Sequence, residues 1–312
     1  MELVKDLFGN PASQRKGITL NLYHDERKIP SQWFYHSFCF VPVENENKVL
    51  EALIHHRKQS AWEKEIHFKD IDNTRTENDL AVRWINYFGA EGFNDFYFYL
   101  LGINLQQIEK QLWRSDTRDH RIYNRFFQIG LYSAIKWFFL NSTVGYSSVV
   151  LNRIFSHKRS HEDKDAFHTK PIFETLEKSL DRRESISFNS YRIVEVNSDH
   201  EEEPDNPSGS HLIQFVDIIM GTFSQIYDNT SNQQGKKLCA DAMLRCGLPK
   251  KIAGVNPNSR YYKKYALSFF PLAKISKKDF LGKTLQYFQA SQFYSDRDMA
   301  YTAKGQMVLF ST

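Results

Sequence analysis

Residues 17–26 alternate apolar and polar side chains, with Ile18, Leu20 and Leu22 on one side of an extended chain. This period of two predicts a β-strand with one buried face. Residues 33–43 form a second run that is rich in aromatic side chains and is stopped by Pro42. Because the link between the two runs is short, we expect an antiparallel hairpin.

The pattern that follows alternates helices and strands. The period of 3.6 or the length of the segment predicts helices over 44–58, 76–90, 120–141 and 165–180. Strands are expected over 63–72, 94–105, 146–155 and 186–196. A last helix over 210–227 is apolar on nearly every side, which is typical of a buried helix. This order predicts an α/β protein with a mixed sheet and helices on both of its faces.

Composition sets limits on the class of protein. The chain has 312 residues and 41% hydrophobic content, enough for one large core or for one core and an appended subdomain. The start of the sequence lacks an apolar core of signal-peptide type, and the longest apolar run, 129–140, is interrupted by Lys136 and too short to span a bilayer. Three cysteines form no disulfide framework. We therefore expect a reduced, cytoplasmic protein that does not bind membranes.

Positive charge is concentrated near the end of the sequence. The net charge is only +4, but residues 245–285 carry ten Lys and Arg side chains against one acid, Asp279. Within this segment, residues 259–280 interleave cations with Tyr and Phe, a pattern that suits phosphate contacts and base stacking. Candidate nucleic-acid contacts are Lys263, Lys264, Lys277 and Lys278. The alternative is an ordinary surface that buries its aromatics and solvates its lysines.

Asp217 lies in the middle of the apolar helix predicted over 210–227. An ionised carboxylate buried alone would be costly, so we expect it to be paired, metal-bound, protonated or at an edge of the core. A purely structural aspartate, bonded to an arginine or to a backbone amide, explains the helix equally well.

Two further stretches place acids beside apolar runs. Asp25 and Glu26 follow the first strand run, where they could mark a plain strand exit or half of a metal site. If residues 63–72 are extended, Glu65 and His67 share one face, and the histidine could bind a metal, shuttle a proton or contact a phosphate. For the isolated stretch, a solvated charged face is the simpler interpretation.

Taken together, these stretches resemble a family. "YHDE" (23–26), "EIHFKDI" (65–71) and "LIQFVDIIMG" (212–221) are similar to the motifs of the domain-of-unknown-function 3800 family. The resemblance covers about residues 17–228, and it lies in the order and context of the motifs rather than in any one of them. It implies a ribonuclease H-like fold, whose members hold divalent metals with clustered acids and cut or join nucleic-acid strands.

The resemblance also implies roles for individual residues. Asp25 and Glu26 match the first acidic pair, Glu65 the middle acid, and Asp217 the acid of the late helix, with Gln214 as the glutamine of that motif. Mg²⁺ or Mn²⁺ would suit these carboxylates and a phosphodiester substrate. Since neighbouring residues of a strand point to opposite faces, we take Asp25 as the primary ligand and Glu26 as the secondary one.

The sequence also departs from the family pattern. The late motif has Phe215 and Val216 before its acid, the helix over 120–141 has no acid in its core stretch, and Asn152 stands where some ribonuclease H-like enzymes carry an aspartate. One metal, two metals or a decayed site therefore all stay open.

The leading prediction is a metal-dependent nuclease, or a related phosphoryl-transfer enzyme, with Asp25, Glu65 and Asp217 as metal ligands, Glu26 in support and His67 near the scissile phosphate. The alternatives are a non-catalytic nucleic-acid-binding or regulatory protein that keeps the scaffold, and a nucleic-acid-binding module of a mobile element or a defence system. For the fold, we expect a ribonuclease H-like mixed five-stranded sheet flanked by helices. It would form a domain over 1–229 with a helical insertion at about 44–90, followed by a basic C-terminal extension over 230–312 packed on the core.

Overall fold

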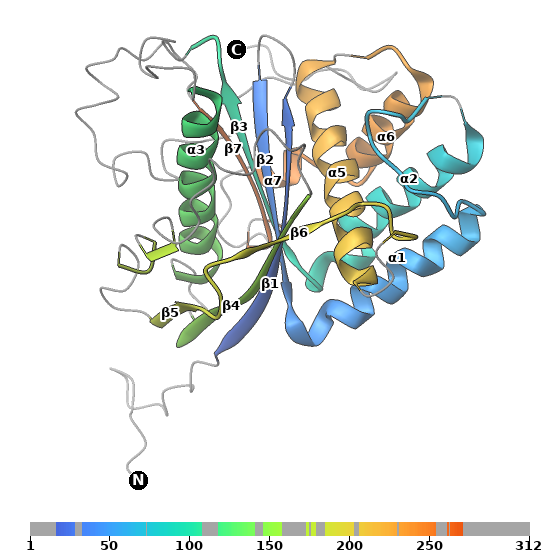
Figure 1. Ribbon diagram of the computed structural model, residues 1–312. Coiled ribbons are helices and arrows are strands. Elements are labelled where there is room, and N and C mark those ends of the chain that lie inside the picture. The colour runs from blue at the N-terminus through green and yellow to red at the C-terminus, as the bar shows by residue number, and fades with distance from the viewer. Residues whose placement is uncertain are drawn as a thin grey trace, which may run out of the picture.

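The computed structural model describes residues 17–28, 33–72, 74–107, 118–140, 146–157, 173, 174, 176–178, 185–202, 206–229, 231–253, 261 and 263–270. Within these ranges a single sheet of seven strands runs through the molecule (Figure 1). The strands are β1 (Ile18–Lys28), β2 (Trp33–Pro42), β3 (Tyr97–Asn104), β4 (Ser148–His157), β5 (Ser185–Phe188), β6 (Ile193–Val196) and β7 (Tyr265–Phe270).

The strand order is β5-β4-β1-β2-β3-β7, and β6 also pairs with β4. Strands β1, β2 and β3 form an antiparallel meander, which confirms the predicted hairpin. Strand β4 then returns parallel to β1, and β5, β6 and β7 also pair in parallel. This sheet confirms the mixed α/β class that the order of elements predicts, and its meander followed by parallel strands is the ribonuclease H-like order that the resemblance implies.

The prediction of five strands is wrong in two places. Residues 186–196, expected as one strand, form the two short strands β5 and β6, which pair with successive halves of β4. The chain turns between them, where the backbone N–H of Asn189 donates to the carbonyl of Leu151 and its side chain donates to Asn152. Strand β7, in the predicted extension, adds a parallel edge strand beside β3.

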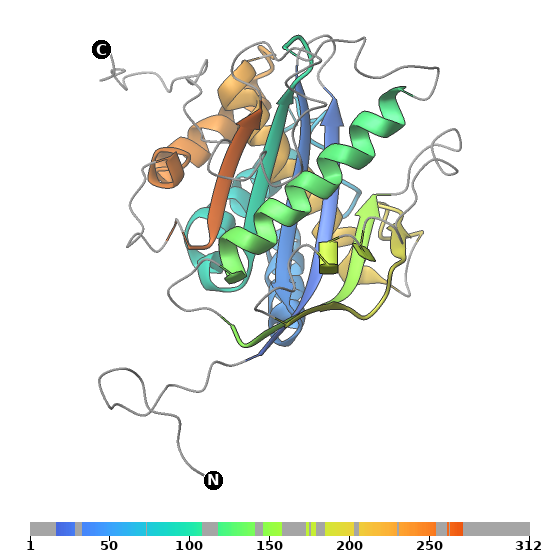
Figure 2. The same cartoon turned by 90° about the vertical axis from the view of Figure 1, so that its left-hand side faces the viewer.

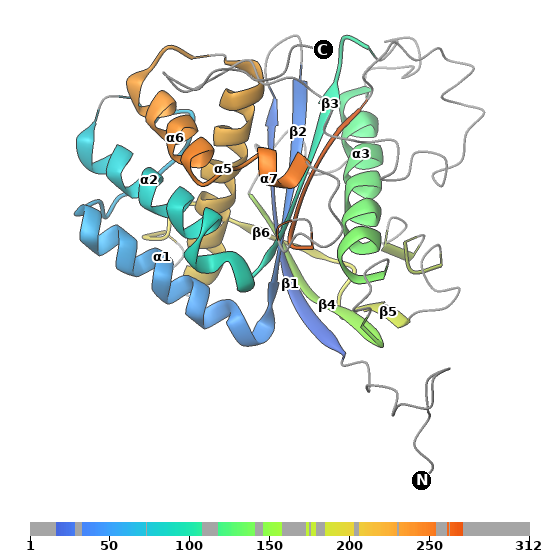
Figure 3. The same cartoon turned by 180° about the vertical axis from the view of Figure 1, so that it is seen from behind.

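Helices cover both faces of the sheet, as predicted. Helix α3 (Arg118–Ile135), continued by a π-helical stretch η4 (Lys136–Leu140), crosses one face (Figure 2). The other face carries α1 (Glu46–Ser60), α2 (Arg75–Gly89), α5 (Pro207–Asp228) and α6 (Gln234–Arg245), as Figure 3 shows from behind. Short helices η1 (Val43–Asn45), η2 (Glu91–Asn94) and α7 (Lys250–Ala253) complete the described elements. None of the helices in these ranges is long and apolar enough to cross a membrane.

The period of two in β1 divides the core into two layers. Ile18, Leu20 and Leu22 are buried in the layer beneath α3, while Tyr23 belongs to the layer beneath α5. Since side chains alternate along a strand, Asp25 shares the α5 face with Tyr23, and His24 and Glu26 share the α3 face. The expectation that Ile18, Leu20 and Leu22 share a buried face is confirmed.

Residues 61–72 form an irregular connection between α1 and α2 rather than the expected strand. Part of the reason is that backbone N–H groups of this loop bond to side chains of α5 and not to a neighbouring strand. Ile66 donates to Gln214 at 3.1 Å and Phe68 donates to Asp217 at 2.8 Å. The segment is therefore placed by a helix that lies far along the chain.

The described part of the predicted C-terminal extension comprises α6, α7 and β7. Helix α6 lies beside α2, and Tyr265 of β7 stacks on Phe88 with ring centroids 4.4 Å apart and donates its hydroxyl to the Phe88 carbonyl. Most of the helix predicted over 165–180 lies outside the described residues. Within this range the structure describes residues 173, 174 and 176–178, and these are helical. The division into a core domain and an extension stays a prediction.

Candidate active site

Asp25 lies within β1 and not at its end, because the strand continues to Lys28. Its side chain is 8% exposed, and its Oδ1 accepts the backbone N–H of Glu26 at 2.8 Å. The backbone carbonyl of Asp25 accepts the Ser37 hydroxyl at 2.9 Å. Asp25 is therefore a buried carboxylate presented toward α5 from the middle of the sheet.

Glu26 points away from this face. Its Oε2 lies 3.8 Å from Nδ1 of His24, whose ring packs edge-on against Phe127 of α3. A hydrogen bond continues this layer, since Nε2 of His24 lies 3.0 Å from Nδ1 of His36. The alternation of β1 thus separates the two acids that are adjacent in sequence.

Helix α5 presents a stripe of residues to the 61–72 loop. Gln214, Asp217 and Gly221 are spaced by three and four residues and so lie on one face of the helix. Gln214 is fully buried; its Oε1 accepts Nη2 of Arg57 at 2.7 Å as well as the Ile66 N–H, and its Nε2 donates to the carbonyl of Ser198. A single amide therefore joins α1, the 61–72 loop and the segment before α5.

Gly221 completes the stripe at the point where the ring of Phe68 packs on α5. A Cβ at this position would lie only 2.1 Å from Cγ of Phe68. The glycine thus allows the loop to approach the helix closely enough for the Phe68 N–H to reach Asp217.

His67 lies between two carboxylates. Its Nε2 is 2.8 Å from Oε1 of Glu65, and its Nδ1 is 3.5 Å from Oδ2 of Asp217. Hydrogen bonds to Asp217 and to Glu65 raise the pKa of His67 to about 10, so the ring is a cation at neutral pH. The hydrogen bond from His67 lowers the pKa of Glu65 to about 2.

Asp25 and Asp217 interact electrostatically across the same space. Burial, and then the charges of Asp217 and Glu26, raise the pKa of Asp25 well above its usual range. Burial alone would also raise the pKa of Asp217. Hydrogen bonds from His67 and from the Phe68 N–H, together with the charges of Arg27 and His67, outweigh burial and lower this pKa. The two carboxylates therefore differ, with Asp217 ionised and Asp25 the group that holds a proton more readily.

His157, the last residue of β4, also belongs to the cluster. Its Nδ1 is 3.9 Å from Oδ1 of Asp25, its Nε2 is 2.9 Å from the Ser198 hydroxyl, and its ring lies 5.9 Å from that of His67. Burial, and then the positive charge of His67, lower its pKa. The sequence pattern predicts a strand that ends at residue 155, two residues before His157. A strand longer by two residues, in parallel register with β1, would have placed it beside Asp25.

The cluster opens to solvent at one side. Exposed fractions of the side chains rise from 8% at Asp25 and 14% at Asp217 to 28% at Glu65 and 37% at His157. A ligand would therefore reach Glu65 and His157 first and the two aspartates last.

The carboxylates suit a hard divalent cation in kind, because such ions prefer oxygen ligands and would offset the repulsion between the acids. In the part of the chain that the structure describes, however, no three His, Cys, Asp or Glu side chains are arranged to hold a metal ion. His67 engages Glu65 and Asp217, and Oδ2 of Asp217 also accepts the Phe68 N–H. In this arrangement His67 neutralises Glu65 and Asp217, and the acids do not surround a common point.

The predicted basic contacts lie elsewhere. The strand register aligns Asp25 of β1 with Leu267 of β7, three strand spacings or about 14 Å away across the sheet. Lys263 and Lys264 come just before Leu267 in the chain. Lys264 is largely buried, with its Nζ 3.7 Å from the ring centroid of Tyr97, and burial lowers its pKa to about 8. Lys263 is exposed, whereas Lys277 and Lys278 lie outside the described residues.

Asn152, noted as a departure from the family pattern, has a structural partner. Its Nδ2 donates to Oδ1 of Asn21 at 3.0 Å, and the Asn21 amide in turn contacts Glu46. This amide network links β4, β1 and the start of α1.

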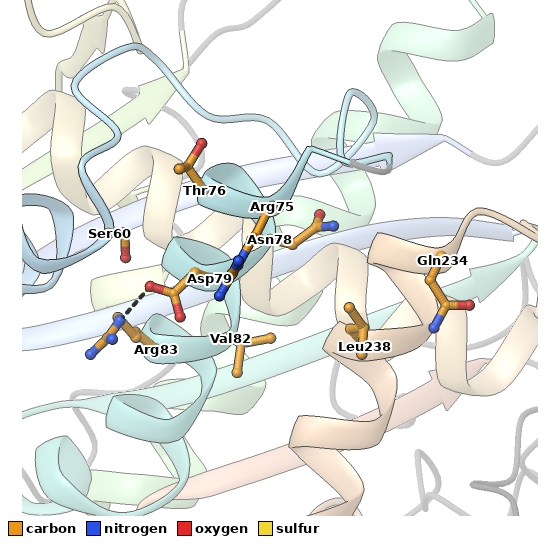
Figure 4. Close-up of a pocket in the computed structure, with 9 residues that line it drawn as sticks. All are labelled: Ser60, Arg75, Thr76, Asn78, Asp79, Val82, Arg83, Gln234 and Leu238. Atoms are coloured by element: carbon orange, nitrogen blue, oxygen red, sulfur yellow. Dashed lines mark hydrogen bonds and ion pairs between the residues drawn. The ribbon is translucent and has the colours of Figure 1, made fainter.

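A separate hollow of about 700 Å³ lies between the end of α1, α2 and α6 (Figure 4). Its lining includes Arg75, Gln234 and an ion pair between Asp79 and Arg83 at 2.7 Å. None of the predicted site residues lines it.

The similarity of the chain to known proteins is limited. No family model matches the chain, and no curated protein matches it. Among solved structures, the chain is similar to the ribonuclease H2 from Pyrococcus horikoshii OT3, with 10% sequence identity, 78% of this chain and 93% of that chain covered, and a TM-score of 0.32. A score of this size does not establish kinship, so the description of this fold rests on its own strand order and pairing.

Proposed function

We propose that the chain is a metal-dependent nuclease, or a related phosphoryl-transfer enzyme, that acts on nucleic acid at the cluster around Asp25 and Asp217. The observation that carries the proposal is the cluster of two buried carboxylates and two histidines from different elements. His157 lies 3.9 Å from Asp25, His67 lies 3.5 Å from Asp217, and the two rings are 5.9 Å apart. The charge of Asp217 also raises the pKa of Asp25. Two like charges held together in a core are costly unless a cation or a proton compensates them. Such pairs are characteristic of functional sites.

In this proposal, Asp25, Glu65 and Asp217 are the side chains that bind Mg²⁺ or Mn²⁺. The ion would supply charge stabilisation at the phosphate and acidify a bound water. Glu26, which faces α3, supports β1 from the other layer and does not touch the ion. The resemblance to the domain-of-unknown-function 3800 family is part of the same proposal, since its three motifs supply these residues.

His67 has a role of its own. It holds a proton between Glu65 and Asp217. A phosphate that enters from the open side of the cluster and replaces one of these acceptors would receive a hydrogen bond or a proton from the ring. His157, with its lowered pKa, offers a neutral imidazole on the other side of Asp25.

A second candidate is a non-catalytic nucleic-acid-binding or regulatory protein that keeps the scaffold. The specific observation in its favour is the engagement of both ring nitrogens of His67 by carboxylates, which neutralises two of the acids without any metal.

The test is cleavage of single- and double-stranded DNA and RNA in the presence of Mg²⁺ or Mn²⁺. We expect Asp25→Asn and Asp217→Asn to lose cutting while remaining folded by circular dichroism and melting. Glu201→Gln, at an exposed acid that is not one of the cluster residues, is the control and should cut as the wild type does. If both aspartate variants cut as fast as the wild type, the proposal fails. If the wild type cuts none of the substrates, the non-catalytic candidate is favoured.

A further inference from the structure

Two cations lie beside the acid cluster around the ring of Phe68. Arg27 follows Asp25 by two residues on β1, so it projects from the same face about 7 Å farther along the strand. Its Cζ lies 5.0 Å from the centroid of the Phe68 ring. Lys236, near the start of α6, places its Nζ 5.7 Å from the same centroid.

The two side chains are held in different ways. Lys236 is 7% exposed and donates to the backbone carbonyl of Lys69 at 2.8 Å, which fixes it against the loop. Arg27 is half-buried, and its Nε, which is shielded from solvent, has no hydrogen-bond acceptor among the described residues. This Nε–H is thus a donor that the described protein does not use.

The charges of these groups act on their neighbours. Burial, and then the charge of Arg27, lower the pKa of Lys236. The charges of Asp70 and Asp217 raise this pKa and so offset part of the repulsion between Arg27 and Lys236. An anionic ligand bound beside the two cations would reduce the remaining repulsion.

We propose that Arg27 binds a backbone phosphate of a nucleic-acid strand beside the acid cluster, with Lys236 adding positive charge from behind Phe68. The inference rests on the proposed function and names the substrate contact of that site. Arginine suits this task because its planar fork of donors matches phosphate oxygens and its face stacks on an aromatic ring. The inference also moves the expected phosphate contact from Lys263 and Lys264 to β1.

The experiment measures binding without cleavage. Fluorescence anisotropy in EDTA would follow single-stranded DNA and RNA 20-mers over a range of salt concentrations. For Arg27→Gln we expect about fivefold weaker binding at fixed salt. The slope of log K against log salt should also be smaller in magnitude by about 0.7, the value for one phosphate contact on a single strand.

Two further variants keep the result interpretable. Arg27→Lys retains the charge and should retain most of the salt slope, even if the stacked guanidinium is needed for folding at full stability. Arg245→Gln removes an exposed arginine at the far end of α6, the helix that carries Lys236, and should leave both affinity and slope unchanged.

The inference is overturned if Arg27→Gln has the wild-type slope, or if the wild type binds neither probe. Binding that depends on Arg27 in a protein that never cuts would sink the proposed function and leave this inference standing. Cutting that depends on Asp25 and Asp217, together with binding that does not depend on Arg27, would support the proposed function and overturn this inference.

Discussion

The backbone N–H of Phe68 donates to Oδ2 of Asp217 at 2.8 Å, joining residues 149 positions apart in the chain. The same aspartate lies 3.5 Å from Nδ1 of His67, the residue before Phe68. Asp217 therefore has two tasks, since it anchors a loop through the backbone and sets the charge of a side chain on that loop. A variant that removes the carboxylate will disturb both, so predictions about this site need variants that separate loop placement from charge.

Gln214→Leu should release the loop without touching any acid. Leucine leaves Nη2 of Arg57, the Ile66 N–H and the Ser198 carbonyl without their partner on α5. Because leaving buried polar groups unsatisfied costs about 1–3 kcal/mol each, we expect a loss of about 3 kcal/mol in the free energy of unfolding, measured in urea. The pKa of His67, followed by NMR, should fall toward its ordinary value.

Gln225→Leu is the matched control for this prediction. Gln225 is equally buried on α5 and bonds the segment after the helix through Asn229 and Ser231. Its loss should also reduce stability but leave the pKa of His67 unchanged. Equal pKa values of His67 in both variants would contradict the role given to Gln214.

The sequence predicts the positions of only some residues of the site. The period of two in β1 places Asp25 and Glu26 on opposite faces, and the helical spacing of Gln214 and Asp217 places them on one side of α5. Both are local regularities of the backbone. The strand predicted over 63–72 is wrong because the N–H groups of Ile66 and Phe68 bond to side chains of α5, an interaction that no local pattern contains. Strand β7 was missed because a parallel edge pairing depends on a partner strand far away in sequence.

His67 should make the folded protein less stable as the pH becomes alkaline. Its pKa is raised from 6.5 to about 10 by Asp217 and Glu65, so the folded protein holds this proton more tightly than the unfolded chain does. The resulting stabilisation is complete below pH 6.5 and is lost as the pH rises toward 10. The difference in unfolding free energy between the wild type and His67→Gln, measured in EDTA, should therefore shrink between pH 6.5 and 10. A difference that stays constant over this range would show that His67 is not charged in the folded protein.

Divalent metal should stabilise the wild type and not Asp25→Asn. A ligand that binds only the folded state at ten times its Kd adds about 1.4 kcal/mol, which is visible as a rise in melting temperature. We expect Mn²⁺ to raise the melting temperature of the wild type and of Glu201→Gln, whose exposed acid lies outside the cluster. Equal shifts for the wild type and Asp25→Asn would place metal binding elsewhere, and the absence of any shift would favour the non-catalytic candidate.

Gly221→Ala separates the packing of the loop from its charges. In an exposed helix this substitution would stabilise by up to about 1 kcal/mol, because alanine has the higher helix propensity. Here the new Cβ would lie 2.1 Å from Cγ and 2.5 Å from Cβ of Phe68, so we expect a loss of about 1–3 kcal/mol in the free energy of unfolding instead.

A double-mutant cycle with Phe68→Ala tests the cause of that loss. Removing the ring eliminates the closest clash, so Gly221→Ala should cost less in the Phe68→Ala background than in the wild type, with a coupling energy above 0.5 kcal/mol. Additive effects would mean that the glycine serves some purpose other than seating Phe68. Because Arg27 lies over this ring, Phe68→Ala should also weaken nucleic-acid binding in EDTA, whereas a ring that only fills space would leave binding unchanged.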